Sequence, residues 1–130
     1  MGLATTFDTF KGSYTTFHRW RNYIAEIAGY MVSEIPDYYP DTEIPVIDWG
    51  HITEENLMGD WEKIPEDPLI ILIAHHDYKG YLFPNYNLLI AQRLESLLDK
   101  IICDEMKNIT CLFIMGLYAS VQNETRIRFF

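Results

Sequence analysis

The fold is decided by the stretch at residues 67 to 101, which reads DPLIILIAHHDYKGYLFPNYNLLIAQRLESLLDKI. In this stretch two apolar segments flank a polar turn. Asp67 and Pro68 are a strong helix start, because the aspartate can accept a free backbone N–H and proline fits the first helical position. The segment from Leu69 to Ile73 is apolar nearly all round and too short to span a bilayer, so it must be buried in the core.

A second helix is predicted to begin at Pro84 and Asn85. Its apolar side chains recur at helical spacing, at Ile90, Leu94, Leu97, Leu98 and Ile101. Gly80, in the turn before this helix, suits the left-handed conformation of a helix cap. We expect the two helices to form the central pair of the fold.

Two longer helices are predicted on either side of this pair. The first has Ser13 as its N-cap and extends through Ala28, with Arg19 and Arg21 facing water. It either stops at Gly29 or continues for one more turn over 30–32. The second follows Asp104 as N-cap. Its length favours a helix, although the run from 111 to 114 also fits a buried strand, because periodicity cannot separate the two there.

Strands are predicted at the two ends of the chain, over 3–10 and 125–130, because their side chains alternate. We expect these strands to pair, and residues 11–13 to form a turn. The predicted fold class is therefore α+β and mostly helical. Three to four helices surround the central helix pair, and a small two- or three-stranded sheet is built from the termini.

The length of 130 residues predicts a single domain over 1–130. With neither a signal peptide nor a membrane span in the sequence, a soluble intracellular protein is the expectation. Two cysteines lie eight positions apart, Cys103 and Cys111, and we expect both to be free, buried thiols in a reducing compartment. No Cys-x-x-Cys pair is present, so neither a structural zinc site nor another cofactor is predicted.

The net charge of −9 is concentrated in one part of the chain. Residues 31 to 67 hold eleven acidic residues and one basic residue, which gives −10, whereas the remainder holds eight acidic and nine basic residues, which gives +1. Four prolines interrupt the stretch from 33 to 66, so this acidic segment is expected to be irregular, with a short strand near 44–48 and a helical turn capped by Thr53. Such a segment repels the phosphates of nucleic acids, so we predict no direct binding to nucleic acid.

Several short motifs along the chain resemble a family of small proteins of unassigned function found in bacteriophages and prophages. They are Gly12-Ser13-Tyr14, Phe17-His18-Arg19-Trp20-Arg21, Asp67-Pro68-Leu69, His75-His76-Asp77 with Gly80, and Ala91-Gln92-Arg93-Leu94-Glu95. In that family the central turn reads His-Ser-Asp-Cys-Asp-Gly and precedes a helix. Here Tyr78 and Lys79 replace the cysteine and the second aspartate, and the acidic segment has no counterpart. The resemblance implies a bacterial host cell, and its cytoplasm, as the setting.

The polar turn at 75–80 is the candidate ligand site, with His75, His76, Asp77, Tyr78 and Lys79 as its residues. A metal ion could be bound there with help from His18 or His51, because imidazole and carboxylate suit transition metals. Adjacent histidines at a helix end point about 100° apart, however, so both rarely reach one ion. The favoured interpretation is structural: His75 or Asp77 hydrogen-bonds to backbone groups across the turn.

Two classes of function follow. No nucleophile motif, glycine-rich phosphate loop or His-Glu-x-x-His is present, so a non-enzymatic protein is predicted. The first hypothesis is a binding protein that presents its acidic segment to a basic, nucleic-acid-binding surface of a host protein, as an inhibitor of bacterial defence such as an anti-CRISPR. The predicted contact residues are Asp37, Tyr38, Tyr39, Asp41, Glu43, Glu54, Glu55, Asp60 and Glu62.

The second hypothesis is a small-ligand protein that binds a signalling nucleotide or a metal ion at the 75–80 turn. Lys79, Arg19 and Arg21 would then contact phosphate. Neither hypothesis involves a membrane, and the sequence leaves the oligomeric state open.

Overall fold

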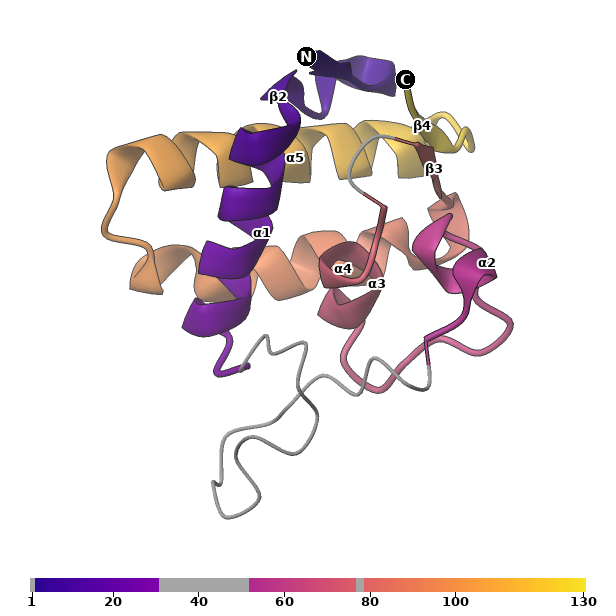
Figure 1. Ribbon diagram of the computed structural model, residues 1–130, viewed down its shortest axis with the longest axis horizontal. Coiled ribbons are helices and arrows are strands. Elements are labelled where there is room, and N and C mark those ends of the chain that lie inside the picture. Colours follow the sequence, from indigo (N-terminus) through magenta and orange to yellow (C-terminus); the bar gives the residue numbers. More distant parts are fainter. Residues whose placement is uncertain (1, 31–51, 77–78) are drawn as a thin grey trace.

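The computed structural model describes residues 2–30, 52–76 and 79–130 of the chain (Figure 1). Its helices are α1 (Tyr14–Ile27), α2 (Glu54–Leu57), α3 (Leu69–Ile73), α4 (Pro84–Leu97) and α5 (Asp104–Gln122), with short 3-10 turns at Thr6–Asp8 and Leu98–Lys100. Its strands are β1 (Gly2–Ala4), β2 (Lys11–Ser13), β3 (Gly80–Leu82) and β4 (Ile127–Phe129). The mostly helical α+β fold class is confirmed.

Two layers of helices enclose the core. The helices α4 and α5 lie side by side and run in opposite directions, and α1 crosses in front of both (Figure 1). The aromatic rings of α1 and α5 meet at this crossing, where the centroids of Trp20 and Phe113 are 4.7 Å apart. The indole N–H of Trp20 donates to Thr110 Oγ1 at 2.9 Å, which satisfies the one polar atom that this ring buries.

The helix boundaries follow local hydrogen bonds that the sequence predicts. Ser13 Oγ accepts the backbone N–H of Thr16 at 3.0 Å, and Asp67 Oδ1 accepts that of Leu69 at 3.0 Å. Asp104 is the first residue of α5 rather than its N-cap. The run from 111 to 114 is helical, so the strand alternative is wrong there.

The strands form two separate antiparallel sheets, β1 with β2 and β3 with β4. Residues 11–13, predicted as a turn, are a strand, because Ser13 pairs with Gly2. The reversal of this hairpin lies at Thr6–Asp8 instead, where Phe7 and Asp8 have φ values of +63° and +52°. The termini do meet, through hydrogen bonds between Ala4 and Phe130, but the ladder partner of β4 is β3 from the middle of the chain.

The residues on either side of the 31–66 stretch are held together. The Tyr30 hydroxyl donates to Asp67 Oδ2 at 2.6 Å, and Arg93 Nε donates to Asp67 Oδ1 at 3.3 Å. Burial and the neighbouring carboxylate raise the pKa of Tyr30 above its ordinary value, which keeps its proton on this hydrogen bond. Asp67, which accepts the backbone N–H of Leu69 at the start of α3, therefore also joins the residues on either side of the 31–66 stretch.

Both cysteines are free, as predicted, but Cys103 is half-buried and Cys111 is exposed. The prediction of buried thiols is wrong for Cys111, because it lies on the outer side of α5. None of the helices that the structure describes has the combination of length and apolar character that crossing a membrane requires.

Candidate functional site: the acidic hollow beside α2

A platform formed by residues 53–63, around α2, carries four exposed acidic side chains, Glu54, Glu55, Asp60 and Glu62. It is fastened by three hydrogen bonds: the His76 N–H donates to Leu57 O at 2.7 Å, the Tyr81 N–H donates to Met58 O at 2.9 Å, and the Tyr86 hydroxyl donates to Gly59 O at 2.6 Å. These bonds join residues 57–59 to the 75–80 turn, β3 and α4. The platform is thereby fixed to the core, although its own residues are largely exposed.

A close backbone approach makes this attachment possible. Gly59 has a φ of +94°, and a Cβ atom built there would lie 1.7 Å from Tyr81 O. Gly80, with a φ of +103°, also lies too close for a side chain, since a Cβ atom built there would be 2.8 Å from Met58 O. Only glycine fits both the left-handed conformation and the space.

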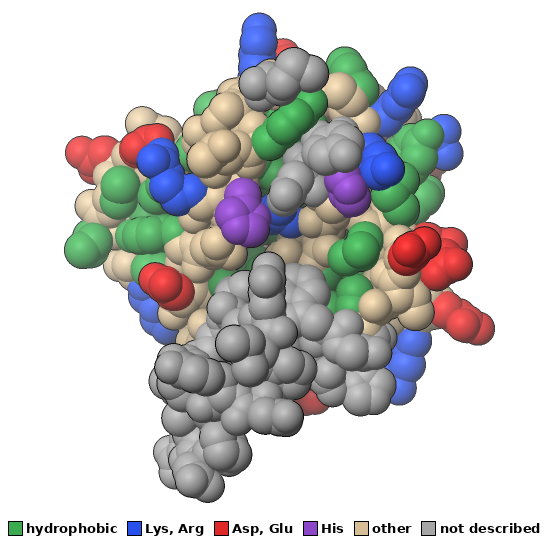
Figure 2. Space-filling view, viewed as in Figure 1, with side chains coloured by type: hydrophobic (Ala, Val, Ile, Leu, Met, Phe, Trp, Pro, Cys, Tyr) green, Lys and Arg blue, Asp and Glu red, His purple; other side chains and the backbone are tan. Residues whose placement is uncertain are grey.

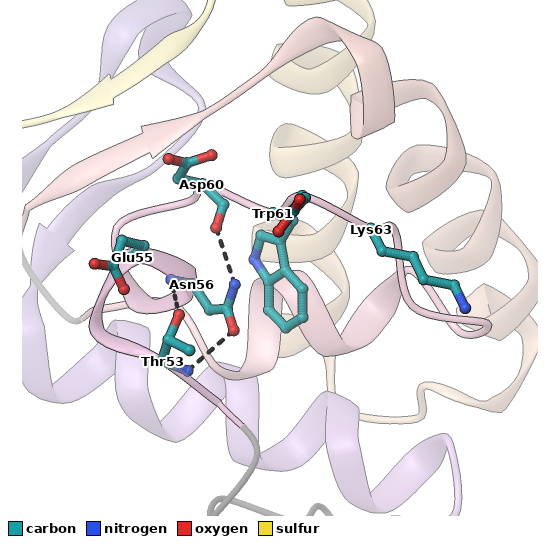
Figure 3. A pocket seen from close by; sticks show the side chains of 7 residues that line it. Thr53, Glu55, Asn56, Asp60, Trp61 and Lys63 are labelled. Atoms are coloured by element: carbon teal, nitrogen blue, oxygen red, sulfur yellow. Dashed lines mark hydrogen bonds between the residues drawn. The ribbon is translucent and has the colours of Figure 1, made fainter.

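A hollow of about 470 Å³ opens beside this platform (Figure 3). It is lined by Thr53, Glu55, Asn56, Asp60, Trp61, Glu62 and Lys63. Reciprocal hydrogen bonds between Thr53 and Asn56 cap α2, and Asn56 Nδ2 also donates to Asp60 O at 2.9 Å. One wall of the hollow is therefore rigid.

The half-buried ring of Trp61 stands in the hollow between Asn56 and Lys63 (Figure 3). Its Nε1 is buried, and within the described residues it has no hydrogen-bond partner. Such an atom marks a place where a bound molecule or water can complete the hydrogen bonding. The aromatic face beside carboxylates is also a surface that attracts cations.

Among the described residues, the acidic side chains that line the hollow have no ion-pair partner. Residues 52 to 67 hold six acidic residues and one basic residue, which gives −5. Only Asp67 of these acids forms an ion pair with a residue that the structure describes, namely Arg93. Glu54, Glu55, Asp60 and Glu62 are exposed, and acidic side chains gather over α2 in Figure 2.

The structure brings together part of the predicted contact surface. Glu54, Glu55, Asp60 and Glu62 lie on or beside the platform. Asp37, Tyr38, Tyr39, Asp41 and Glu43, as well as the strand predicted near 44–48, lie outside the described residues. The sequence analysis did not assign Thr53, Asn56 or Trp61 to the site, although a tryptophan between Asp60 and Glu62 is a signal for it.

At the other candidate site, the 75–80 turn, His75 is closed off from solvent. His75 is 2 % exposed. Its Nδ1 lies 2.9 Å from His76 O, and its Nε2 lies 3.0 Å from Tyr81 O. Neither ring nitrogen of His75 is therefore accessible for the ligand binding that the sequence predicted. His76 is half-buried and Lys79 is exposed, whereas residues 77 and 78 lie outside the described part.

The prediction that Arg21 faces water and contacts phosphate is wrong. It is 3 % exposed, and its guanidinium donates to the carbonyl oxygens of Leu72, Ile73 and His75. These carbonyls lie at the C-terminal end of α3, whose free acceptors attract a cation. Arg19 is exposed and pairs with Glu105 at 2.7 Å. Among the described residues no group of three or more metal-ligating side chains is found.

Burial lowers the pKa of His75 to about 4, although the two carbonyl oxygens favour the charged ring. Between pH 4 and pH 6.5, the ordinary pKa of a histidine, the unfolded chain therefore binds a proton that the folded chain does not. The linkage relation then makes stability fall as the pH is lowered through this window, by up to about 3 kcal/mol.

We expect His75→Gln to reduce this fall, so that the free energy of unfolding from urea denaturation changes less between pH 6.5 and 4 than in the wild type. His18 is exposed, so His18→Gln, which removes an imidazole elsewhere on the protein, serves as the control. An unchanged pH dependence in His75→Gln would contradict the assignment.

Comparison of the chain with protein-family models, with curated proteins and with solved structures gave no match.

Proposed function

We propose that the protein is a non-enzymatic binding protein that uses the acidic hollow beside α2 to engage a basic surface of another protein. The observation that carries this proposal is the set of exposed carboxylates of Glu54, Glu55, Asp60 and Glu62, which form no ion pair with another described residue and lie on a platform that is hydrogen-bonded to the core. A fixed acidic surface meets a basic partner without first having to be ordered.

The hollow suits a lysine or arginine side chain of the partner. Its volume of about 470 Å³ accommodates such a chain, the carboxylates at its rim supply charge-assisted hydrogen bonds, and the ring of Trp61 supplies a cation–π contact. A main-chain carbonyl of the partner is also the kind of acceptor that Trp61 Nε1 lacks.

The partner class that we propose is a nucleic-acid-binding protein in the cytoplasm of a bacterial host. Arginines and lysines that hold phosphates are the groups for which exposed carboxylates compete, so binding would block nucleic acid. Inhibition of bacterial defence, as by an anti-CRISPR, fits this chemistry and the resemblance to phage proteins.

The test is the affinity for a nona-arginine peptide, measured by fluorescence anisotropy with the wild type and two charge-reversed variants. Asp60→Lys/Glu62→Lys removes two carboxylates of the hollow and is expected to weaken binding about tenfold or more at about 100 mM salt, a loss of about 1.4 kcal/mol. Glu26→Lys/Asp99→Lys reverses two exposed acids on other elements and gives the same net charge, so it is the matched control.

We expect the control to weaken binding by less than about threefold, because surface charges farther than about 10 Å away are largely screened. Binding by the wild type should also weaken as salt is raised. An equal loss in the two variants would mean that only net charge matters, and the hollow would then not be the binding site.

A further inference from the structure

Trp61 supplies the one aromatic surface among the described residues that line the acidic hollow. Its ring is half-buried and stands between Asn56 and Lys63 (Figure 3). A side chain of another molecule that enters the hollow therefore meets a flat, apolar ring with carboxylates close to it. The chemistry of this ring decides which cation the hollow holds best.

The side chains of Thr53 and Asn56, the neutral polar residues of the hollow, are already hydrogen-bonded. Thr53 Oγ1 accepts the N–H of Asn56 at 3.1 Å, and Asn56 Oδ1 accepts the N–H of Thr53 at 3.0 Å. Asn56 Nδ2 donates to Asp60 O at 2.9 Å. Because these groups are paired within the platform, recognition of a cation is left to the carboxylates and to the ring.

Lys63 is the basic residue among those that line the hollow. Its side chain extends away from Glu55 and Asp60 (Figure 3), and it forms no ion pair with a residue that the structure describes. The carboxylates are therefore left for a cation from another molecule.

The exposed carboxylates by themselves do not distinguish lysine from arginine. Glu55, Asp60 and Glu62 are all exposed, so an ion pair with either cation is weakened by water and by salt. A nona-arginine and a nona-lysine peptide carry the same number of charged side chains, so this attraction is nearly equal for the two. A large difference between them must come from another contact.

The ring of Trp61 is a contact that makes this distinction. A guanidinium group is planar and weakly hydrated, and it stacks on aromatic faces, whereas a lysine ammonium group is compact and keeps its water more strongly. A guanidinium group stacked on the ring directs its N–H groups outward in its own plane, where a carboxylate such as that of Asp60 or Glu62 can accept two of them. Arginine therefore gains from the ring and from the carboxylates at once.

We propose that the hollow is selective for an arginine side chain over a lysine side chain, and that Trp61 is the residue that sets this selectivity. The inference rests on the proposed function, which by itself requires only a basic partner. It narrows the partner to a protein that presents an exposed arginine to the hollow.

Fluorescence anisotropy with nona-arginine and with nona-lysine at about 100 mM salt tests the inference. We expect the wild type to bind nona-arginine about fivefold or more tightly, a ratio within the range of a cation–π contact. In Trp61→Leu the ratio should fall to about twofold or less, because leucine is apolar but has no aromatic face. In the wild type the ratio should persist at about 300 mM salt although both affinities fall, since stacking is screened less than charge.

Two further variants serve as controls. Phe130→Leu removes an aromatic ring that is 60 % exposed and lies outside the hollow, so it should keep the wild-type ratio. Trp61→Phe retains an aromatic ring and should keep a larger ratio than Trp61→Leu. Because each ratio compares two peptides on the same variant, a general loss of stability lowers both affinities and leaves the comparison valid.

Two results would overturn the inference: equal affinity of the wild type for the two peptides, or a ratio in Trp61→Leu as large as in the wild type. Both would leave the proposed function standing, provided that Asp60→Lys/Glu62→Lys still weakens binding more than Glu26→Lys/Asp99→Lys. An equal loss in those two charge-reversed variants would instead reject the hollow as the binding site, and both proposals with it.

Discussion

Arg21→Met is expected to lower the free energy of unfolding by roughly 3 to 5 kcal/mol, because it removes a buried cation whose partners remain buried. The guanidinium donates to three carbonyl oxygens at the end of α3 and also lies over the ring of Phe17, with 4.5 Å between Cζ and the ring centroid. Methionine retains much of the packing but donates no hydrogen bond. Urea denaturation at pH 7 measures the loss.

Arg19→Met is the matched control, since Arg19 is two positions away on the same helix. Its ion pair with Glu105 is 57 % and 60 % exposed at the two side chains, and exposed pairs contribute about 1 kcal/mol or less. A comparable loss in the two variants would show that Arg21 does not hold α1 to α3.

Gly59→Ala is expected to lower the free energy of unfolding by about 3 kcal/mol or more. The added Cβ would lie 1.7 Å from Tyr81 O, so the bond between the Tyr81 N–H and Met58 O cannot keep its geometry. The left-handed backbone adds a cost of about 1 to 2 kcal/mol for any residue other than glycine. Urea denaturation again measures the change.

Gly29→Ala separates the cost of the steric clash from the cost of the left-handed backbone. Gly29 has nearly the same φ, +93°, but no atom of the described residues lies within 4 Å of a Cβ built there. This variant should therefore lose only the conformational part, about 1 to 2 kcal/mol. If both variants lost the same stability, the close approach between the platform and β3 would not be a stabilising feature of the fold.

Because Gly59 also anchors the platform, Gly59→Ala tests how the hollow depends on the core. Residues 60–63 follow Gly59 directly and supply most of the charge and the aromatic ring of the hollow. A shifted platform would move these side chains away from Thr53 and Asn56. The loss of stability is therefore expected together with weaker binding of the nona-arginine peptide.

Much of the helical structure could be predicted from the sequence, because its causes are local. Ser13, Thr53 and Asp67 cap helices through hydrogen bonds to residues two or three positions away. The apolar spacing of Ile90, Leu94 and Leu97 predicted the buried side of α4, and all three are buried. Exposure of the acids at 54–62 could likewise be predicted, since charge runs rarely enter a core.

The place of Arg21 could not be predicted, although its spacing contains a hint. Position 21 lies four after Phe17 and three before Ile24, so it falls on the apolar side of α1. Its charge argued for solvent instead. Arg21 is buried because its guanidinium hydrogen-bonds to carbonyl oxygens 51 to 54 residues later in the chain. Only the folded structure brings these oxygens within reach.

The sequence alone determined most of the helical segments, the caps at Ser13 and Thr53, and where the negative charge is concentrated, because each depends on neighbours within a few positions. Tertiary structure decided that β4 pairs with β3, that Arg21 and His75 are buried, and that Trp61 stands among carboxylates in a hollow. Those features join atoms that are distant in the chain. Their partners are set by how the helices pack, which no local pattern specifies.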